Sequence, residues 1–208
     1  MPNFNILRES KPKKTFRVAS VMGKFDLQTE HIKEQFEGNI DLQDDWQIGL
    51  IVGSSGTGKT TIAKELFENA YVTNFKYKAE TILDDMPENV SVEDITKTFN
   101  SVGFSSPPSW LKPYSVLSNG QKMRVDLANA LLREDDLVVF DEFTSVVDRN
   151  VAKIGSYAMQ KAIRKSSKQF IAVTCHHDVQ DWLLPDWVFN TDSMTFQKLE
   201  GQKKNRPK

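Results

Sequence analysis

The stretch of sequence that decides the fold is Gly53-Ser54-Ser55-Gly56-Thr57-Gly58-Lys59-Thr60, or GSSGTGKT. It matches the phosphate-binding pattern G-x-x-x-x-G-K-[ST] in full. The apolar run of residues 48–52 before it predicts a strand, and the spacing of residues 61–67 predicts a helix after it. The glycines let the backbone turn its N–H groups toward a polyphosphate, and the helix adds the positive end of its dipole. We therefore predict that these residues, together with Thr61, bind a nucleotide.

Two residues of this loop have predicted roles of their own. Lys59 is expected to reach the β- and γ-phosphates, and the hydroxyl of Thr60 is expected to hold Mg²⁺. The alternative is a glycine-rich turn that binds no ligand, and the strand before it and the helix after it make that alternative the weaker one.

Composition bounds the class of protein. The chain has 208 residues, of which 39% are hydrophobic and 26% are charged, as expected for one soluble globular domain over residues 1–208. The net charge of −1 argues against a surface built as a whole to attract nucleic acid. The single cysteine, Cys175, excludes an internal disulfide and suits a reducing compartment. With neither a long apolar segment nor a signal peptide, a cytoplasmic location is predicted.

Both ends of the chain are basic. Residues 203–208 carry lysine and arginine, and residues 201–208 are predicted to form a disordered basic tail. The N-terminal cluster is interpreted in the same way, as a solvated end, and it consists of Arg8, Lys11, Lys13, Lys14 and Arg17.

The order of the predicted elements indicates an α/β fold. Helices are expected at residues 60–70, 91–99, 120–132 and 151–164, and strands at 16–21, 46–52, 137–140, 170–174, 187–190 and 194–199. Residues 28–36 are interpreted as helical or irregular. Because buried apolar strands alternate with helices, we predict a P-loop NTPase with a mostly parallel sheet flanked by helices.

A second motif pairs two carboxylates at the end of a strand. The run Leu137-Val138-Val139-Phe140 is followed by Asp141 and Glu142. In a P-loop sheet, Asp141 would hold Mg²⁺ and Glu142 would polarise the attacking water. A solvated strand end is the alternative for this motif taken alone.

Three further stretches resemble one family. Residues 117–121 (LSNGQ) resemble the LSGGQ signature of ATP-binding-cassette (ABC) ATPases, with Asn119 in place of the first glycine. Residues 141–148 (DEFTSVVD) resemble the family's DEPTSxLD, and residues 174–178 (TCHHD) resemble its switch-histidine segment. The motifs stand in the family's order, and the resemblance covers roughly residues 49–192.

The resemblance implies a composite site that binds ATP and Mg²⁺ between two chains packed head to tail. The phosphate loop of one chain would face the signature of the other, which here is Ser118, Asn119, Gly120 and Gln121. It also implies a switch histidine, His176 rather than His177, that contacts the γ-phosphate, and a loop contact across the dimer at Asp148. A homodimer in the ATP-bound state is therefore expected.

The chain departs from the family in four places. Only 59 residues separate Lys59 from Ser118, so the helical subdomain is expected to be reduced, to about residues 74–116. No glutamine occurs in that gap, and Glu80, Asp84 and Asp85 are left as possible substitutes for the family's metal-contacting glutamine. Phe143 replaces the proline after Glu142. The sequence also does not identify the aromatic residue that stacks on adenine. Phe16 and Phe25 are the candidates, and the alternative for each is a position in the core.

The predicted function is a soluble ABC-type ATPase whose dimer closes on a DNA or protein partner. The first alternative is the ATP-binding subunit of a membrane transporter, although the short gap and the missing glutamine count against it. The second is a P-loop kinase for a small molecule, which would not need the LSNGQ motif. A nucleotide-binding module without hydrolysis is disfavoured by the intact Glu142.

Overall fold

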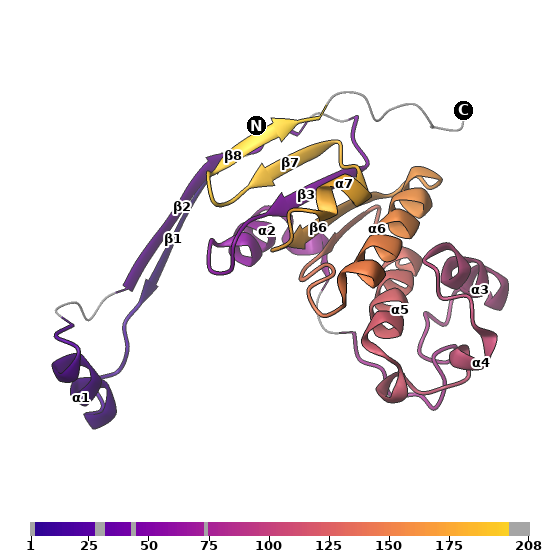
Figure 1. Cartoon of the computed structure of the whole chain (residues 1–208), viewed down its shortest axis with the longest axis horizontal. Coiled ribbons are helices and arrows are strands. Elements are labelled where there is room, and N and C mark those ends of the chain that lie inside the picture. Colours follow the sequence, from indigo (N-terminus) through magenta and orange to yellow (C-terminus); the bar gives the residue numbers. More distant parts are fainter. Residues whose placement is uncertain (1–2, 28–31, 43–44, 73–74, 200–208) are drawn as a thin grey trace.

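The computed structural model describes residues 3–27, 32–42, 45–72 and 75–199. Its centre is a six-stranded sheet in the order β4-β5-β6-β3-β7-β8 (Figure 1). Neighbouring strands are parallel except β8, which runs antiparallel to β7. In chain order the strands are β3 (Ile48–Val52), β4 (Tyr71–Val72), β5 (Leu137–Phe140), β6 (Gln169–Thr174), β7 (Trp187–Asn190) and β8 (Thr195–Lys198). The predicted fold class is confirmed.

Successive residues of the central strands belong to two cores, one on each face of the sheet. Val138 packs with the helices on one face, whereas Val139 packs in the cluster that contains Ile62 on the other. All five residues of β3 are buried, which is what an apolar run without alternation predicts for a parallel strand covered on both sides.

The helices cover the two faces of this sheet unequally. The first face carries α5 (Asn119–Leu132) and α6 (Arg149–Arg164), and the other carries α2 (Lys59–Phe67), which continues into η1 (Glu68–Ala70). The predicted helices at residues 60–70, 120–132 and 151–164 match them closely. After the N-terminal region, the other helical elements of the described residues are α3 (Val92–Ser101), α4 (Pro107–Trp110), η2 (Tyr114–Val116) and α7 (Val179–Leu183). None of the helices in the described residues is long and apolar enough to cross a membrane.

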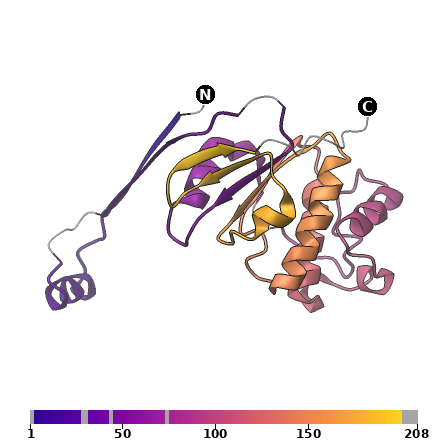
Figure 2. The same cartoon turned by 45° about the horizontal axis from the view of Figure 1, so that its top comes forward.

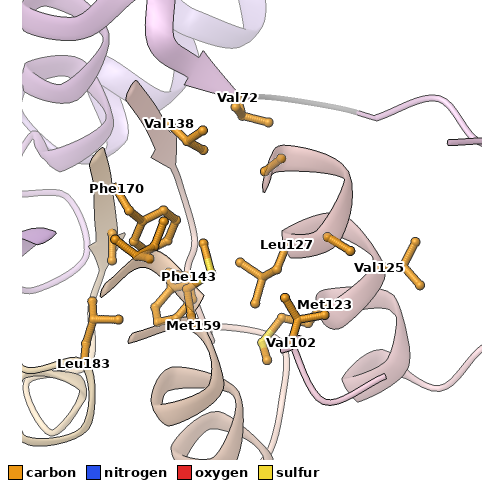
Figure 3. Packing of buried hydrophobic residues seen from close by; sticks show 14 of the residues in the cluster. Val72, Val102, Met123, Val125, Leu127, Val138, Phe143, Met159, Phe170 and Leu183 are labelled. Atoms are coloured by element: carbon orange, nitrogen blue, oxygen red, sulfur yellow. The ribbon is translucent and has the colours of Figure 1, made fainter. Parts of the chain in front are cut away.

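Phe143 is fully buried in the core next to α5 and α6. Its ring meets that of Phe140 edge to face, with centroids 6.2 Å apart, and that of Phe170, with centroids 5.6 Å apart. Figure 3 shows Phe143 beside Phe170. The N–H of Phe143 donates to the carbonyl of Val173 at 2.9 Å. A proline has no N–H, so the residue that replaces the family's proline here adds a hydrogen bond from the loop after β5 to β6.

The described residues 3–27 and 32–39 form an arm that the sequence did not predict. Strands β1 (Asn3–Ser10) and β2 (Ile32–Asn39) pair antiparallel, and the helix α1 (Phe16–Lys24) lies at the far end of the pair (Figures 1 and 2). The prediction of a strand at 16–21 is wrong, because Thr15 caps a helix there by accepting from the N–H of Val18 at 3.3 Å.

One other expectation for the N-terminal region is wrong, because the part of residues 28–36 that the structure describes belongs to strand β2. Arg8 is exposed, as predicted for a solvated residue, and it belongs to the partner strand β1. The root of the arm is anchored to the sheet, because Phe4 is buried and its ring lies 5.7 Å from that of Phe189. The predicted basic tail at 201–208 lies outside the described residues.

Gly49 tests the packing between β3 and β7. It pairs with Trp187, and a Cβ added at Gly49 would lie 2.1 Å from the Trp187 ring. Gly49→Ala is therefore expected to lower the free energy of unfolding by about 1–3 kcal/mol, measured by urea denaturation. Gly23→Ala is the control, because its added methyl group meets nothing within 4 Å. Equal stability of the two variants would contradict this packing.

Candidate nucleotide-binding site

The predicted site residues converge on the edge of the sheet where the parallel strands end. The phosphate loop follows β3, Asp141 and Glu142 follow β5, and the two histidines follow β6. Val52, the last residue of β3, pairs with Thr174 of β6 on one side and with Asn190 of β7 on the other. This register brings loops from distant parts of the sequence together at the position where α/β sheets bind ligands.

The phosphate loop has the backbone that its glycines predict. Gly56 and Gly58 have φ angles of 85° and 86°, in the left-handed region that favours glycine. Helix α2 starts directly after Gly58, and it has neither a side-chain cap nor an acidic residue in its first turn. Its first N–H groups and the positive end of its dipole are therefore left for an anion.

The loop is held in place from β7. A Cβ on Gly53 would lie 2.2 Å from the hydroxyl of Thr191, so only glycine fits at this point. The hydroxyls of Thr57 and Thr191 are 2.5 Å apart, and Thr57 also donates to the carbonyl of Ser54 at 2.9 Å. Lys59 Nζ donates to the same carbonyl at 2.6 Å.

Asp192 is a site residue that the sequence analysis missed. Its carboxylate accepts from the N–H of Ser54 at 3.0 Å, so it places a negative charge on the phosphate loop. This hydrogen bond, with His177 and Lys59 nearby, lowers the pKa of Asp192. No recognised motif includes Asp192, but its place two residues after β7 was a signal, because β7 adjoins β3.

Thr60 and Asp141 meet as predicted for a magnesium site. Thr60 Oγ1 donates to Asp141 Oδ2 at 2.8 Å, and the hydroxyl of Tyr71 donates to the same oxygen. Burial and the Asp141 carboxylate raise the pKa of Tyr71, which keeps it protonated as a donor. A hydroxyl and a carboxylate beside a polyphosphate site fit Mg²⁺, which takes few protein ligands and completes its shell with phosphate and water. Tyr71 was also missed by the sequence analysis.

Glu142 lies at a strained turn next to this pair. Its φ is 53°, and that of Thr144 is 66°, both unusual for residues other than glycine. The N–H of Glu142 donates to Asp141 Oδ1 at 2.9 Å. Since Phe143 is fixed in the core between these two residues, the turn directs Glu142 into the cavity that Thr60 and Asp141 also line.

His177 is connected to the hydrogen-bond network of the phosphate loop. His177 Nε2 lies 3.7 Å from Asp192 Oδ2, and Asp192 in turn binds Ser54. His176, the residue that the sequence analysis favours, is half-buried, and its backbone N–H donates to Thr174 Oγ1 at 3.2 Å. The role of His176 as the switch histidine therefore stays a prediction.

The signature forms the capped start of α5. Ser118 and Gln121 make a capping box: Ser118 Oγ accepts from the N–H of Gln121 at 3.3 Å, and Gln121 Oε1 accepts from the N–H of Ser118 at 3.0 Å. A Cβ on Gly120 would lie 2.9 Å from Val151, so α5 and α6 start in close contact. Asp148 caps α6 by accepting from the N–H groups of Asn150 and Val151, both at 3.0 Å.

The loop of Asp148 is also tied to the histidine segment. Arg149 donates from Nε to Asp178 Oδ2 at 3.0 Å and makes a second hydrogen bond to the same carboxylate. This bidentate pair connects the start of α6 with the residue that follows His177. It was not predicted, because Arg149 and Asp178 are 29 residues apart.

A cavity of about 630 Å³ separates the phosphate loop from α5. Thr60, Asp141 and Glu142 line one side of it, and Asn119 and Asp126 line the other. The candidate substitutes for the missing glutamine are not among the described residues that line this cavity. Two of the three form hydrogen bonds with nearby residues instead. Asp85 accepts from the N–H groups of residues 78 and 79, and Asp84 accepts from the hydroxyl of Thr81. Glu80 is exposed.

Neither proposal for Phe16 and Phe25 holds. Both lie at the far end of the arm, 89% and 65% exposed, so they are neither core residues nor neighbours of the phosphate loop (Figure 1). Phe36 is the aromatic residue beside the loop, and a Cβ on Gly58 would lie 2.5 Å from its ring. With Arg8 and Glu34 of the arm, Phe36 lines a second cavity, of about 270 Å³, next to the loop.

Comparison with known proteins agrees with this geometry. Residues 49–184 match the model of the ATPase family associated with various cellular activities (AAA). The chain belongs to the AAA family of ATPases. The predicted P-loop ATPase activity and the resemblance to ABC proteins are both confirmed, because the curated relatives and the similar structures of this AAA-family chain are ABC proteins.

Two curated relatives show the range of similarity. A probable ATP-binding cassette sub-family F member 3 homolog of Encephalitozoon cuniculi is 30% identical over 105 residues, which are 48% of this chain and 19% of that protein. The energy-coupling factor transporter ATP-binding protein EcfA1 of Leuconostoc mesenteroides is 25% identical over 189 residues, covering 72% of this chain and 68% of that protein. The AAA-family chain thus spans about a fifth of the length of the first relative and about two thirds of the second.

Solved structures share the fold. The dimeric structure of MJ0796, a bacterial ABC transporter cassette, superposes with a TM-score of 0.67 and 14% identity over 96% of this chain and 98% of that chain. A dimeric post-hydrolysis state of MJ0796, bound to ADP and Pi, gives a TM-score of 0.61 with 16% identity over 81% of this chain and 93% of that chain. The AAA-family chain therefore has the fold of an ABC cassette.

Asp126 is a half-buried carboxyl in the wall of the larger cavity. Its Oδ2 accepts from the hydroxyl of Tyr114 at 2.9 Å, and the Tyr114 ring stacks on that of Tyr77. Burial raises the pKa of Asp126 to about 6, although the hydroxyls of Tyr77 and Tyr114 and the charge of Lys122 oppose the shift. The folded protein therefore binds this proton more tightly than the unfolded chain does.

The stability that this proton contributes should depend on pH. It is present in full below about pH 4, the pKa of an unfolded aspartate, and is lost as the pH rises through about 6. Asp126→Asn keeps an acceptor for Tyr114 without a charge. We expect it to be more stable than the parent at pH 8, by up to about 3 kcal/mol, and to lose this advantage at pH 4, as measured by denaturant unfolding. The exposed Asp26→Asn is the control, and a pH-independent difference for Asp126→Asn would contradict the assignment.

Proposed function

We propose that this ATPase binds and hydrolyses ATP with Mg²⁺ at a composite site between two copies of the chain. ATP binding closes the homodimer, and hydrolysis reopens it. The observation that carries the proposal is that each chain holds one phosphate loop, with free N–H groups at the start of α2, and one capped signature helix, so two copies packed head to tail form two equivalent sites. The dimeric cassette structures that share this fold support the pairing.

Within one chain, the phosphate loop would bind the nucleotide. The free N–H groups at the start of α2 and the ammonium of Lys59 would bind the phosphates, and Lys59 would release the carbonyl of Ser54 to do so. Thr60 and Asp141 would hold Mg²⁺, which neutralises charge that develops on the phosphates. Tyr71 orients the carboxylate of Asp141 through its hydrogen bond.

Glu142 would position the attacking water. It lines the same cavity as the magnesium pair, and it follows Asp141 directly in the chain. The histidine segment would report the presence of the γ-phosphate, because His177 contacts Asp192 and Asp178 contacts Arg149 at the start of α6. His176 remains the second candidate for this contact.

The partner chain would complete the site. Ser118 and the first N–H groups of α5 would face the γ-phosphate bound by the other chain, and the helix dipole would stabilise the negative charge of the transition state. Asp148 would lie at the contact between the two chains. In this arrangement each site uses the phosphate loop of one chain and the signature of the other.

The dimer is proposed to work on a DNA or protein partner. The reduced segment between the phosphate loop and the signature supports this, because it leaves only α3, α4 and η2 in place of a larger helical subdomain. The second candidate is an ATP-binding subunit of a membrane transporter, favoured by the likeness to EcfA1 proteins. Stable co-purification with a membrane-spanning protein would select the second candidate.

Glu142→Gln tests the proposed base. The amide cannot accept the proton from water, so turnover should fall by about 100-fold or more, while ATP binding is kept. The closed dimer should also accumulate, because the bound ATP stays intact. ATP turnover and analytical ultracentrifugation in ATP measure the two effects. Turnover close to that of the parent would place the base elsewhere.

Mixing two inactive variants tests whether the site is shared. Ser118→Arg should abolish turnover and leave ATP binding by the monomer nearly intact, since the arginine blocks only the partner's site, and losing one donor typically costs about 100- to 1,000-fold in rate. Lys59→Ala should lose most of its ATP affinity in the same chain. A mixed dimer has one site with both changes and one with neither, so activity should partly return on mixing.

The control for the mixing experiment is each variant mixed with itself at the same total concentration. An absence of recovery at every ratio, together with a monomer in ATP by ultracentrifugation, would mean that the site is built within one chain.

A further inference from the structure

The far end of the arm, residues 10–27, is the most exposed apolar feature of the described chain, and we call it the arm tip. No residue of α1 is buried, and Phe16, Val21, Phe25 and Leu27 are each more than half exposed. In Figures 1 and 2 the arm tip stands away from the rest of the molecule. Exposed apolar side chains gathered on one element indicate a contact surface.

The arm tip is also strongly basic. It contains five lysines and arginines and one acidic residue, Asp26, so its net charge is 5 − 1 = +4, in a chain whose net charge is −1. The remainder of the chain therefore carries −5. The surface that the arm tip fits should combine acidic with apolar groups. The five cations are Lys11, Lys13, Lys14, Arg17 and Lys24.

One segment of the same protein has this complementary character. Residues 80–94, which we call the acidic segment, contain six aspartates and glutamates and no lysine or arginine. Val92, at the start of α3, is 67% exposed. Leu111 is 64% exposed, and it lies beside the segment, because the N–H of Ile82 donates to the carbonyl of Lys112 at 3.0 Å. The six acidic residues are Glu80, Asp84, Asp85, Glu88, Glu93 and Asp94.

The arm tip does not contact the acidic segment of its own chain, because α1 and α3 lie at opposite ends of the molecule in both views (Figures 1 and 2). Along the molecule the order is α1, then α2 with the phosphate loop, then α5 with the signature, then α3 (Figure 1). In a two-fold dimer that places each phosphate loop against the partner's signature, the two copies run in opposite directions. The order of these helices along one copy is then the reverse of the order along the other. Each arm tip then falls on the side of the partner's α3.

We propose that the arm tip of each chain docks on the acidic segment of a second copy and clasps the closed dimer. The inference rests on the proposed head-to-tail dimer and adds a second contact outside the nucleotide site. Basic residues of the arm tip face the acidic segment, while the exposed apolar side chains of α1 cover Val92 and Leu111. The contact is made twice, because the pair is symmetric.

A charge exchange tests this contact. In the Glu142→Gln background, Lys13→Glu/Arg17→Glu should weaken ATP-dependent dimerisation about tenfold at low salt, since exposed ion pairs contribute little each and are screened by salt. Glu80→Lys/Glu88→Lys, at two exposed positions of the acidic segment, should weaken it similarly. All four changes in one chain should restore most of the affinity. Lys161→Glu/Lys165→Glu, at the exposed end of α6, is the control with the same change in charge.

Cross-linking gives a second readout that does not depend on affinity. In a Cys175→Ser background, a chain with Val21→Cys and Val92→Cys should form covalent dimers with a flexible bismaleimide in ATP, because both positions are exposed. A control chain with Val21→Cys and Ile154→Cys, the latter at an exposed position on α6, should form few covalent dimers.

The outcomes separate this inference from the proposed function. Restoration by the four-fold variant, together with the ATP-dependent cross-link, supports the clasp. A Glu142→Gln protein that stays monomeric in ATP would overturn the composite site and the clasp together. A dimer whose affinity ignores the charge of the arm tip, and which does not cross-link, would overturn the clasp alone. The clasp would also be overturned if the Lys13→Glu/Arg17→Glu variant dimerised like the parent but lost binding to a labelled oligonucleotide or to anionic phospholipid vesicles. The arm tip would then bind a polyanion.

Discussion

The register of β3 between β6 and β7 is the constraint on which the site depends. Val52 ends its strand level with Thr174 and Asn190, so three loops leave the sheet at one height. From there Asp192 reaches the amide of Ser54, and Thr191 touches Thr57. A slip of one residue would turn every side chain of β3 to the opposite face and separate these contacts. Full burial of β3 prevents such a slip.

The parts of the molecule that depend on local sequence were predictable. The phosphate loop has its own backbone signature in glycines, and the apolar runs at β5 and β6 were predicted as buried strands and form strands of the central sheet. Helices with a serine or aspartate cap, such as α3, α5 and α6, start within one or two residues of the predicted positions. Thr60 and Asp141 were predicted to serve one magnesium site, because both belong to motifs of known geometry, and the structure brings them into contact.

What the sequence could not reveal depends on pairing between distant residues. Strands β1 and β2 stabilise each other across 21 intervening residues, and neither has a strong strand pattern alone. Tyr71 and Asp192 belong to no motif, so only the neighbouring strands show that they reach Asp141 and Ser54. The conformation of Glu142 depends on Phe143, whose burial no local rule predicts.

The close contact of Gly120 with Val151 couples the signature, at the start of α5, mechanically to the start of α6. Helices α5 and α6 start side by side, and Arg149 ties the start of α6 to Asp178. The two helix starts therefore cannot slide past one another without a steric clash, and they should move as one rigid lever. Any protein that pulls on the far end of α6 would tilt the signature against the nucleotide of the neighbouring chain. Mechanical load on this protein would thus act on ATP turnover without touching the phosphate loop.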